Sequence, residues 1–196
     1  MPATPRRPRS DALQNRERLL EVAAQVFAEQ GLDTAPAAIA RQAGVGVGTL
    51  YRHFPTREAL IEAAYRRRLT RVCEKAADLL TRHAAAEATR AWMEHFLDYA
   101  TAKTGMSEAL NTVIASGADP YADSRALLAQ AVSTLLEAGA RDGTLRTDTT
   151  SDDILLLVGG IAQAAGRYGT REQTLRLIDL VMDALTKGAP QPPRDV

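Results

Sequence analysis

The amino-acid sequence predicts an all-α protein of about nine helices, and three observations support this class. Aromatic residues make up only 5% of the 196 residues, while alanine and leucine are abundant, a composition that favours packed helices over a sheet. Apolar residues recur at helical spacing in several segments. Glycine, proline and capping residues separate these segments at positions that suit helix ends.

The first predicted helix covers residues 11–30, where Leu19, Ala23 and Phe27 follow one another at helical spacing, and it ends at Gly31. The preceding residues 1–10 contain three prolines and three arginines. We expect this basic tail to be disordered.

Two short helices are predicted within residues 34–54. Thr34 is the expected N-cap of the first, and Gly44 breaks the chain before the second. The second helix runs over about residues 46–53 and ends before Pro55, because a residue that precedes proline disfavours the α-helical region.

The rest of the chain is divided into six further helical segments, with expected bounds at residues 56–83, 89–103, 106–115, 121–142, 151–166 and 170–187. Thr56 and Ser151 are the expected N-caps of the first and fifth of these. Thr170 and Gln173 form a capping box at the start of the last. Residues 189–196 form a second tail that we expect to be disordered.

The formal net charge is zero, but the charge is divided unevenly along the chain. Residues 1–75 hold 13 Lys and Arg against 8 Asp and Glu, whereas residues 76–196 hold 11 against 16. Phosphate binding requires a local basic surface rather than a basic whole chain. The N-terminal part is therefore the candidate nucleic-acid-binding region.

The two short helices within residues 34–54 have the spacing of a helix-turn-helix, whose second helix lies in the DNA major groove. Helices of this length are unstable alone, and Ile39, Val45, Leu50 and Phe54 supply the core that should hold them. The opposite face is then left for DNA.

DNA contacts of several kinds are expected on that face. Thr49 and Arg52 lie one turn apart and should reach base edges, while Tyr51 suits a phosphate. The glycines would let the backbone approach DNA closely. The predicted DNA-contacting residues are Thr34, Arg41, Gly46, Val47, Gly48, Thr49, Tyr51, Arg52, His53 and Arg57.

The order and spacing of five short motifs resemble the DNA-binding domain of TetR-family transcriptional regulators. These motifs are Ile39-Ala40, Ala43-Gly44-Val45, Gly48-Thr49-Leu50-Tyr51, His53-Phe54 and Thr56-Arg57-Glu58-Ala59-Leu60. The resemblance implies DNA contacts by Thr34, Thr49, Tyr51, His53 and Arg57. Two positions depart from the family pattern, since Gly46 stands where Ser or Thr is common and Val47 where a polar residue is common. Val47 could instead contact a thymine methyl group.

The resemblance implies two domains. Residues 11–65 would form the helix-turn-helix domain, and residues 66–188 an all-helical domain for ligand binding and dimerisation. This second part is also similar to the SbtR-like C-terminal domains of actinobacterial members, through residues 91–96, 104–106 and 152–160.

A stripe formed by Trp92, Phe96 and Tyr99 is the candidate ligand pocket, because Trp and Tyr combine an apolar body with a polar tip. The alternative interpretation is an ordinary core. The predicted pocket residues are Trp92, Met93, Phe96, Tyr99, Met106, Leu110, Val113 and Ile114.

The last two predicted helices carry broad apolar faces, and Gly159-Gly160 allows a close helix approach. Packing against a second copy of the chain would form a four-helix interface. The alternative is that these faces are buried within one subunit. The predicted interface residues are Ile154, Val158, Ile161, Leu175, Ile178, Met182 and Leu185.

The sequence does not predict an enzyme. The three histidines have no metal-ligand spacing, and there is no glycine-rich phosphate loop, so neither a metal nor a cofactor is expected. Cys73 stands between Arg71 and Lys75, which would lower the pKa of its thiol. We find no secretory signal and no apolar run long enough for a bilayer, which favours a cytoplasmic protein with no membrane partner.

The leading hypothesis is a ligand-responsive DNA-binding transcriptional regulator. It would act as a homodimer on double-stranded DNA, as a repressor that a small molecule releases from a palindromic operator. One alternative is a helix-turn-helix regulator without a small ligand. Another is an all-α binding protein or enzyme with a vestigial helix-turn-helix. The sequence leaves activation open beside repression.

Overall fold

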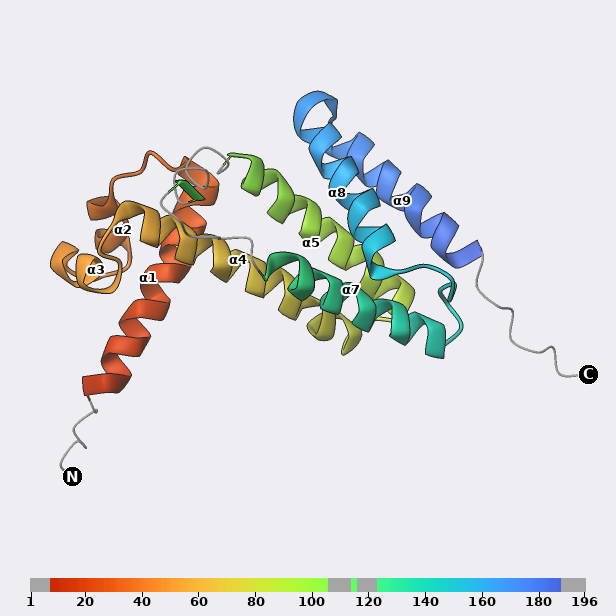
Figure 1. Cartoon of the computed structure of the whole chain (residues 1–196), viewed down its shortest axis with the longest axis horizontal. Coiled ribbons are helices and arrows are strands. Elements are labelled where there is room, and N and C mark those ends of the chain that lie inside the picture. The colour runs from red at the N-terminus through yellow and green to blue at the C-terminus, as the bar shows by residue number, and fades with distance from the viewer. Residues whose placement is uncertain (1–7, 106–113, 116–122, 188–196) are drawn as a thin grey trace, which may run out of the picture. The chain divides into compact units, whose positions relative to one another are not determined.

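The structure, a computed structural model, describes residues 8–105, 114–115 and 123–187, and every regular element in these ranges is an α-helix (Figure 1). The predicted all-α class is confirmed. The described residues form eight labelled helices. Of the helix predicted at 106–115, only the helical residues 114–115 are described. The rest of that segment and most of both predicted tails lie outside the described residues.

The chain divides into two compact units. The first unit comprises residues 1–68 and 105–120, and the second comprises residues 69–104 and 121–196. The division falls inside α4 (Arg57–Leu80), so this helix continues from one unit into the other. The predicted domain bounds of 11–65 and 66–188 stay a prediction.

The first unit is built on α1 (Pro8–Gln30), α2 (Pro36–Gln42), α3 (Val47–His53) and the first part of α4. Both short helices contact α1 and each other. Glycines with positive φ end α1 and α2, at Gly31 and Gly44, because an L side chain is disfavoured in that conformation. Both helix ends were predicted from the sequence.

The starts of the first two helices differ from the prediction. α1 begins at Pro8, so residues 8–10 of the predicted tail are helical; proline is tolerated there because the first N–H groups of a helix lack intrahelical acceptors. The N-cap of α2 is Ala35 rather than Thr34. The Thr34 hydroxyl instead donates a 3.1 Å hydrogen bond to the carbonyl of Gly31 and so closes the preceding turn.

The second unit contains the rest of α4 together with α5 (Ala85–Gly105), α7 (Ser124–Arg141), α8 (Ser151–Tyr168) and α9 (Arg171–Lys187). α8 contacts both α7 and α9, and Figure 1 shows α8 and α9 side by side. Ion pairs also join these helices. Arg90 of α5 lies 2.8 Å from Asp179 of α9, and Arg125 of α7 lies 2.8 Å from Asp152 of α8.

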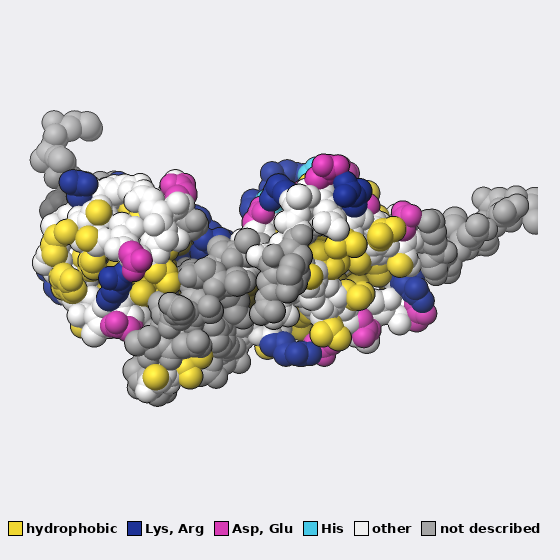
Figure 2. Space-filling view, turned by 90° about the horizontal axis from the view of Figure 1, so that it is seen from above, with side chains coloured by type: hydrophobic (Ala, Val, Ile, Leu, Met, Phe, Trp, Pro, Cys, Tyr) yellow, Lys and Arg dark blue, Asp and Glu magenta, His cyan; other side chains and the backbone are white. Residues whose placement is uncertain are grey.

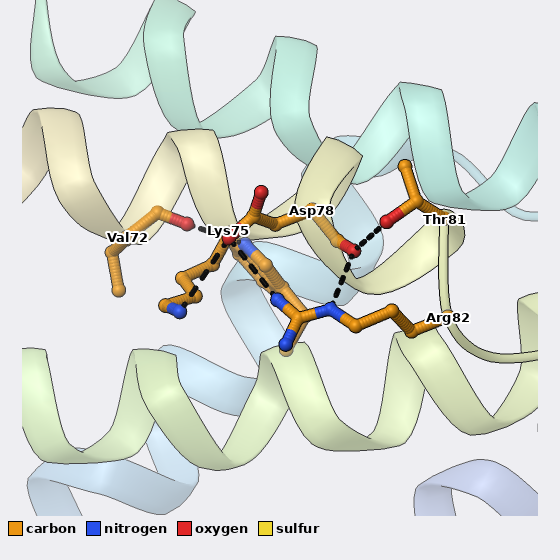
Figure 3. Close-up of polar contacts among 6 residues, drawn as sticks. Val72, Lys75, Asp78, Thr81 and Arg82 are labelled. Carbon is orange, nitrogen blue, oxygen red and sulfur yellow. Dashed lines mark hydrogen bonds and ion pairs between the residues drawn. The ribbon is translucent and has the colours of Figure 1, made fainter.

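α4 ends at Leu80 and does not reach residue 83 as predicted. Side chains that follow the helix take up its last carbonyls (Figure 3). The Thr81 hydroxyl donates to the carbonyl of Asp78 at 2.7 Å, and the Nε–H of Arg82 donates to the same carbonyl at 3.4 Å. These bonds satisfy acceptors that another helical turn would otherwise use.

The starts of α5 and α8 also differ from the prediction. α5 begins at Ala85, so Thr89 lies within the helix and does not cap it; its hydroxyl donates to the Ala85 carbonyl at 2.7 Å. The N-cap of α8 is Thr150 rather than Ser151, in a capping box in which Thr150 and Asp153 each accept from the other's backbone N–H.

The remaining predicted helix ends agree more closely with the structure. Thr56 accepts from the Ala59 N–H at 3.1 Å and Thr170 from the Gln173 N–H at 3.2 Å, as predicted for two N-caps. α7 starts at Ser124, three residues later than predicted, and is followed by Gly143 with a positive φ. None of the helices that the structure describes is long and apolar enough to cross a membrane.

Candidate nucleic-acid interface

The second helix of the helix-turn-helix, α3, is held by its inner face. Leu50 and Phe54 are buried, as is Ile39 on α2. In the turn, the Val45 N–H donates to the carbonyl of Ala40 at 3.0 Å. The predicted core is therefore present, with Val45 half-buried at its edge.

The outer face of α3 is open to solvent. Val47 is 40% exposed and Tyr51 is 45% exposed one turn later, and Arg52 is exposed beside them. Gly48 lies between these side chains on the helix surface, and Thr49 is half-buried. The structure thus presents most of the predicted DNA-contacting side chains of this helix on a single face.

Two arginines outside α3 lie on the helices that contact it. Arg41 on α2 is exposed, as the prediction requires. Arg16 on α1, which sequence reasoning missed, places its guanidinium 5.5 Å from the centre of the Phe54 ring. Its signal in the sequence was its position three residues before the buried Leu19, which puts both residues on the same face of α1.

Arg57 has a different environment from the predicted phosphate contact. Its guanidinium donates to the carbonyl of Leu32 and lies 3.8 Å from the Asp33 carboxylate. Arg57 therefore ties the start of α4 to the loop between α1 and α2. Its phosphate contact stays a prediction, and the structure adds a positioning contact that the sequence did not indicate.

His53 is also less available than predicted. Its side chain is half-buried, and its Nε2 atom is buried without a hydrogen-bond partner. This nitrogen cannot reach a phosphate unless the ring turns. The Thr34 hydroxyl donates its single proton to the Gly31 carbonyl, so it must leave that bond before it can donate to a phosphate oxygen.

The thiol of Cys73 is not activated. Burial is the main cause that raises its pKa to about 11, and the neighbouring Glu74 raises it further. The sequence-based expectation of a lowered pKa is wrong, because desolvation and Glu74 outweigh Arg71 and Lys75. At neutral pH the thiol is almost entirely protonated.

The aromatic stripe predicted to line a ligand pocket is buried. Trp92 and Phe96 stack with ring centres 5.5 Å apart, and Tyr99 follows at 6.0 Å from Phe96. The indole N–H of Trp92 donates to the Val72 carbonyl of α4 at 2.8 Å, so the polar tip of Trp92 is used in packing against α4. Met93 is buried too, Ile114 is exposed, and Met106, Leu110 and Val113 lie outside the described residues.

Two surface depressions occur elsewhere in the second unit. One of about 400 Å³ lies between the end of α4 and the end of α7, lined by His83 and Arg141 among others. The other, of about 310 Å³, lies between α7 and the start of α8, beside Ser133 and Thr149. Neither is lined by the aromatic stripe, so the predicted pocket stays a prediction.

Most residues predicted at the dimer interface lie on the sides of α8 and α9 that are buried within a single chain. Five of them are buried within a single chain, where α8 packs against α7 and α9: Ile154, Val158, Ile178, Met182 and Leu185. Ile161 and Leu175 are half-buried. The exposed aliphatic residues of the two helices are instead Leu156, Leu157, Leu177 and Leu180.

Two family models match this chain. The model for bacterial regulatory proteins of the tetR family matches residues 19–64, which contain α2 and α3. The model for the C-terminal domain of SbtR-like transcriptional regulators matches residues 84–187. Among curated proteins, an HTH-type transcriptional regulator of Staphylococcus aureus is 43% identical over 53 residues. That match covers 26% of this chain and only 29% of the length of the relative.

Solved structures match over nearly the whole chain. A TetR transcriptional regulator from Streptomyces coelicolor is 50% identical over 90% of this chain and 99% of its own, with a TM-score of 0.81. One from Mycobacterium vanbaalenii is 34% identical over 91% and 98%, with a TM-score of 0.73. A TetR-family repressor from Thermus thermophilus, in complex with lauroyl-CoA, shares the fold at 18% identity, with coverage of 92% and 99% and a TM-score of 0.56. The chain therefore belongs to the TetR family of bacterial regulatory proteins and carries an SbtR-like C-terminal domain.

Proposed function

We propose that this protein is a non-enzymatic, cytoplasmic transcription regulator that binds DNA through α3. The observation that carries the proposal is the outer face of α3, where Tyr51 and Arg52 are exposed over a buried Leu50 and Phe54. A helix held from behind in this way can enter the major groove with its polar face forward. Arg16 and Arg41 add positive charge for the phosphates.

The proposed roles follow from these positions. Arg52 reads a base edge, for which its guanidinium fork is suited, and Thr49 supports it from the preceding turn. Arg41 and Tyr51 bind phosphates, and the Thr34 hydroxyl joins them when its proton turns from the Gly31 carbonyl to a phosphate oxygen. Arg57 acts through its bond to the Leu32 carbonyl, which positions the helix-turn-helix on α4.

We also propose that the regulator is a homodimer, with an interface on the exposed sides of α8 and α9. Leu156, Gly160 and Ala164 follow one another at four-residue spacing on α8 and are exposed. Leu177 and Leu180 are exposed on α9. A second copy could cover these leucines, and the small residues would let two α8 helices approach closely.

A homodimer would bind two operator half-sites at once, so two weak protein–DNA contacts would give one specific complex. Its paired α3 helices would read the two halves of a palindromic operator, with half-sites about 34–36 Å apart or a multiple of this distance. One subunit alone would contact a single half-site and lose the affinity gained from simultaneous binding.

The proposed signal is a small molecule bound by the second unit. α4 continues from this unit into the first, where Arg57 links it to the helix-turn-helix. A ligand that favours one position of α4 would change how the two α3 helices fit their half-sites and so release the operator. The Thermus thermophilus repressor, which shares this fold, was solved in complex with a small molecule, lauroyl-CoA.

A DNA selection with the full chain tests the proposal. The protein should enrich a palindromic sequence from random DNA, and that sequence should occur upstream of a gene in the source genome. Binding measured by fluorescence anisotropy at moderate salt should be much tighter than binding to a scrambled duplex. Equal affinity for both duplexes would refute sequence-specific regulation.

A further inference from the structure

Val47 is an exposed branched aliphatic residue at the start of α3, in the first unit. Its side chain is 40% exposed and stands between two glycines, Gly46 and Gly48. The next turn of the same face carries Tyr51, also exposed. The beginning of the outer face is therefore apolar and poor in side chains.

The packing of the unit does not explain the two glycines. A Cβ atom built at Gly46 or Gly48 would meet nothing within 4 Å, and neither residue has a positive φ. Gly46 is the N-cap of α3, where glycine is tolerated, whereas Gly48 lies within the helix, where a glycine costs up to about 1 kcal/mol relative to alanine. What the glycines provide is a bare helix surface on both sides of Val47.

The charge around the outer face of α3 indicates which class of partner can bind there. Arg41 and Arg52 are exposed, and neither has an ion-pair partner among the residues that the structure describes. These cations favour a polyanion over a protein or lipid partner for this face. Within the major groove, the apolar group on a base edge is the 5-methyl group of thymine.

We propose that Val47 contacts the 5-methyl group of a thymine in each operator half-site, and that Gly48 keeps the neighbouring helix surface bare for this approach. The inference rests on the proposed function and deepens it, because it names a base that the operator must contain. Loss of one buried methyl contact should weaken binding about fourfold per half-site.

Deoxyuridine substitution tests this contact without changing base pairing. Each thymine of the selected half-site is replaced in turn by deoxyuridine, which lacks only the methyl group, and binding of the full chain is measured by anisotropy. We expect a loss of about fourfold at one thymine. In the Val47→Ala variant this loss should shrink, since the two methyl groups that reach farthest toward the base are gone.

Two further variants make the result specific. Leu13→Ala removes another exposed aliphatic side chain of the first unit, from α1, and should leave the deoxyuridine effect unchanged. Tyr51→Ala should also leave it in place. The proposal is overturned if the deoxyuridine effect keeps its full size in Val47→Ala. It is also overturned if Tyr51→Ala removes the effect, or if no thymine shows one. A failure to select any DNA sequence would instead refute the proposed function.

Discussion

The outer face of α3 and the exposed sides of α8 and α9 both present aliphatic side chains, but their surroundings differ. On α3, Val47 is exposed together with Arg52, and Arg41 is exposed on α2, which contacts α3. On α8, no charged residue occurs between residues 154 and 166, and Leu156 is 78% exposed. Figure 2 shows hydrophobic side chains at the surface formed by α8 and α9.

The difference indicates two kinds of partner. An apolar group among unpaired cations suits a polyanion that also offers methyl groups, which describes the DNA major groove. Exposed leucines on the uncharged stretch of α8 between residues 154 and 166 suit another apolar helix face, because a protein partner would remove them from water. The exposed apolar residues of one chain can thus be sorted by the charge beside them.

The largest expected effect comes from charging the α8 and α9 face. The double variant Leu156→Glu with Leu180→Glu would bury four carboxylates in each dimer without partners. We expect the dimer dissociation constant to rise by more than about a hundredfold. Sedimentation equilibrium of the full chain measures this, with circular dichroism to show that the helices persist.

Leu127→Glu is the matched control, since Leu127 is also an exposed leucine of the second unit, on α7. It should leave the oligomeric state unchanged. If the double glutamate variant unfolds, the milder Leu156→Ala with Leu180→Ala should still weaken association at retained helix content. A glutamate variant that stays dimeric would show that this face is not the interface.

The next largest effect is expected for Arg52→Ala. Loss of a bidentate contact to a base should cost about 1–3 kcal/mol and relax the base preference at one operator position. Selection from random DNA, repeated with the variant, reads out that position directly. Arg52→Lys should lose the same preference because an ammonium group lacks the fork. A uniform loss over all sequences would reassign Arg52 to phosphate binding.

Much of the fold could be predicted because it depends on local chemistry. Gly31 and Gly44 mark helix ends through their positive φ, and the burial of Leu50 and Phe54 follows from helical spacing. The caps were less predictable. Thr150 and Ser151 are neighbours of similar chemistry, and only the reciprocal bonds with Asp153 show which of them caps α8.

The functional surfaces were harder to predict, for a physical reason. Both α8 and α9 have apolar residues on more than one side, so spacing alone cannot tell the face that packs internally from the face that is exposed. Ile154 and Val158 were predicted at the dimer interface, but α8 uses them for its own core. The positioning contact of Arg57 was missed because its acceptor, the Leu32 carbonyl, lies 25 residues away in the sequence.

Arg41 and Arg57 should separate a phosphate contact from a positioning contact. Arg41→Ala should weaken binding to all sequences and lower the slope of log affinity against log salt by about 1. Arg57→Ala should leave that slope unchanged and instead lower the unfolding free energy, by about 1 kcal/mol for a half-exposed hydrogen bond. Arg176→Ala on α9 is the control for removal of a surface arginine. A reduced salt slope in Arg57→Ala would restore its predicted role at phosphate.

The smallest change, Gly48→Ala, sharpens the comparison most, because its effects on stability and on binding should have opposite signs. Alanine at this helical position meets no neighbour, so the free energy of unfolding should rise by up to about 1 kcal/mol. The added methyl group lies on the face that approaches DNA, so operator affinity should fall severalfold.

Gly160→Ala on α8 offers a matched test on the other surface. There a methyl group also meets no neighbour within the chain, yet it should weaken the dimer and leave the salt dependence of DNA binding unchanged. Thermal denaturation and anisotropy measure both variants. Tighter operator binding by Gly48→Ala, in step with its stability, would mean that the glycine serves neither the fold nor the approach to DNA.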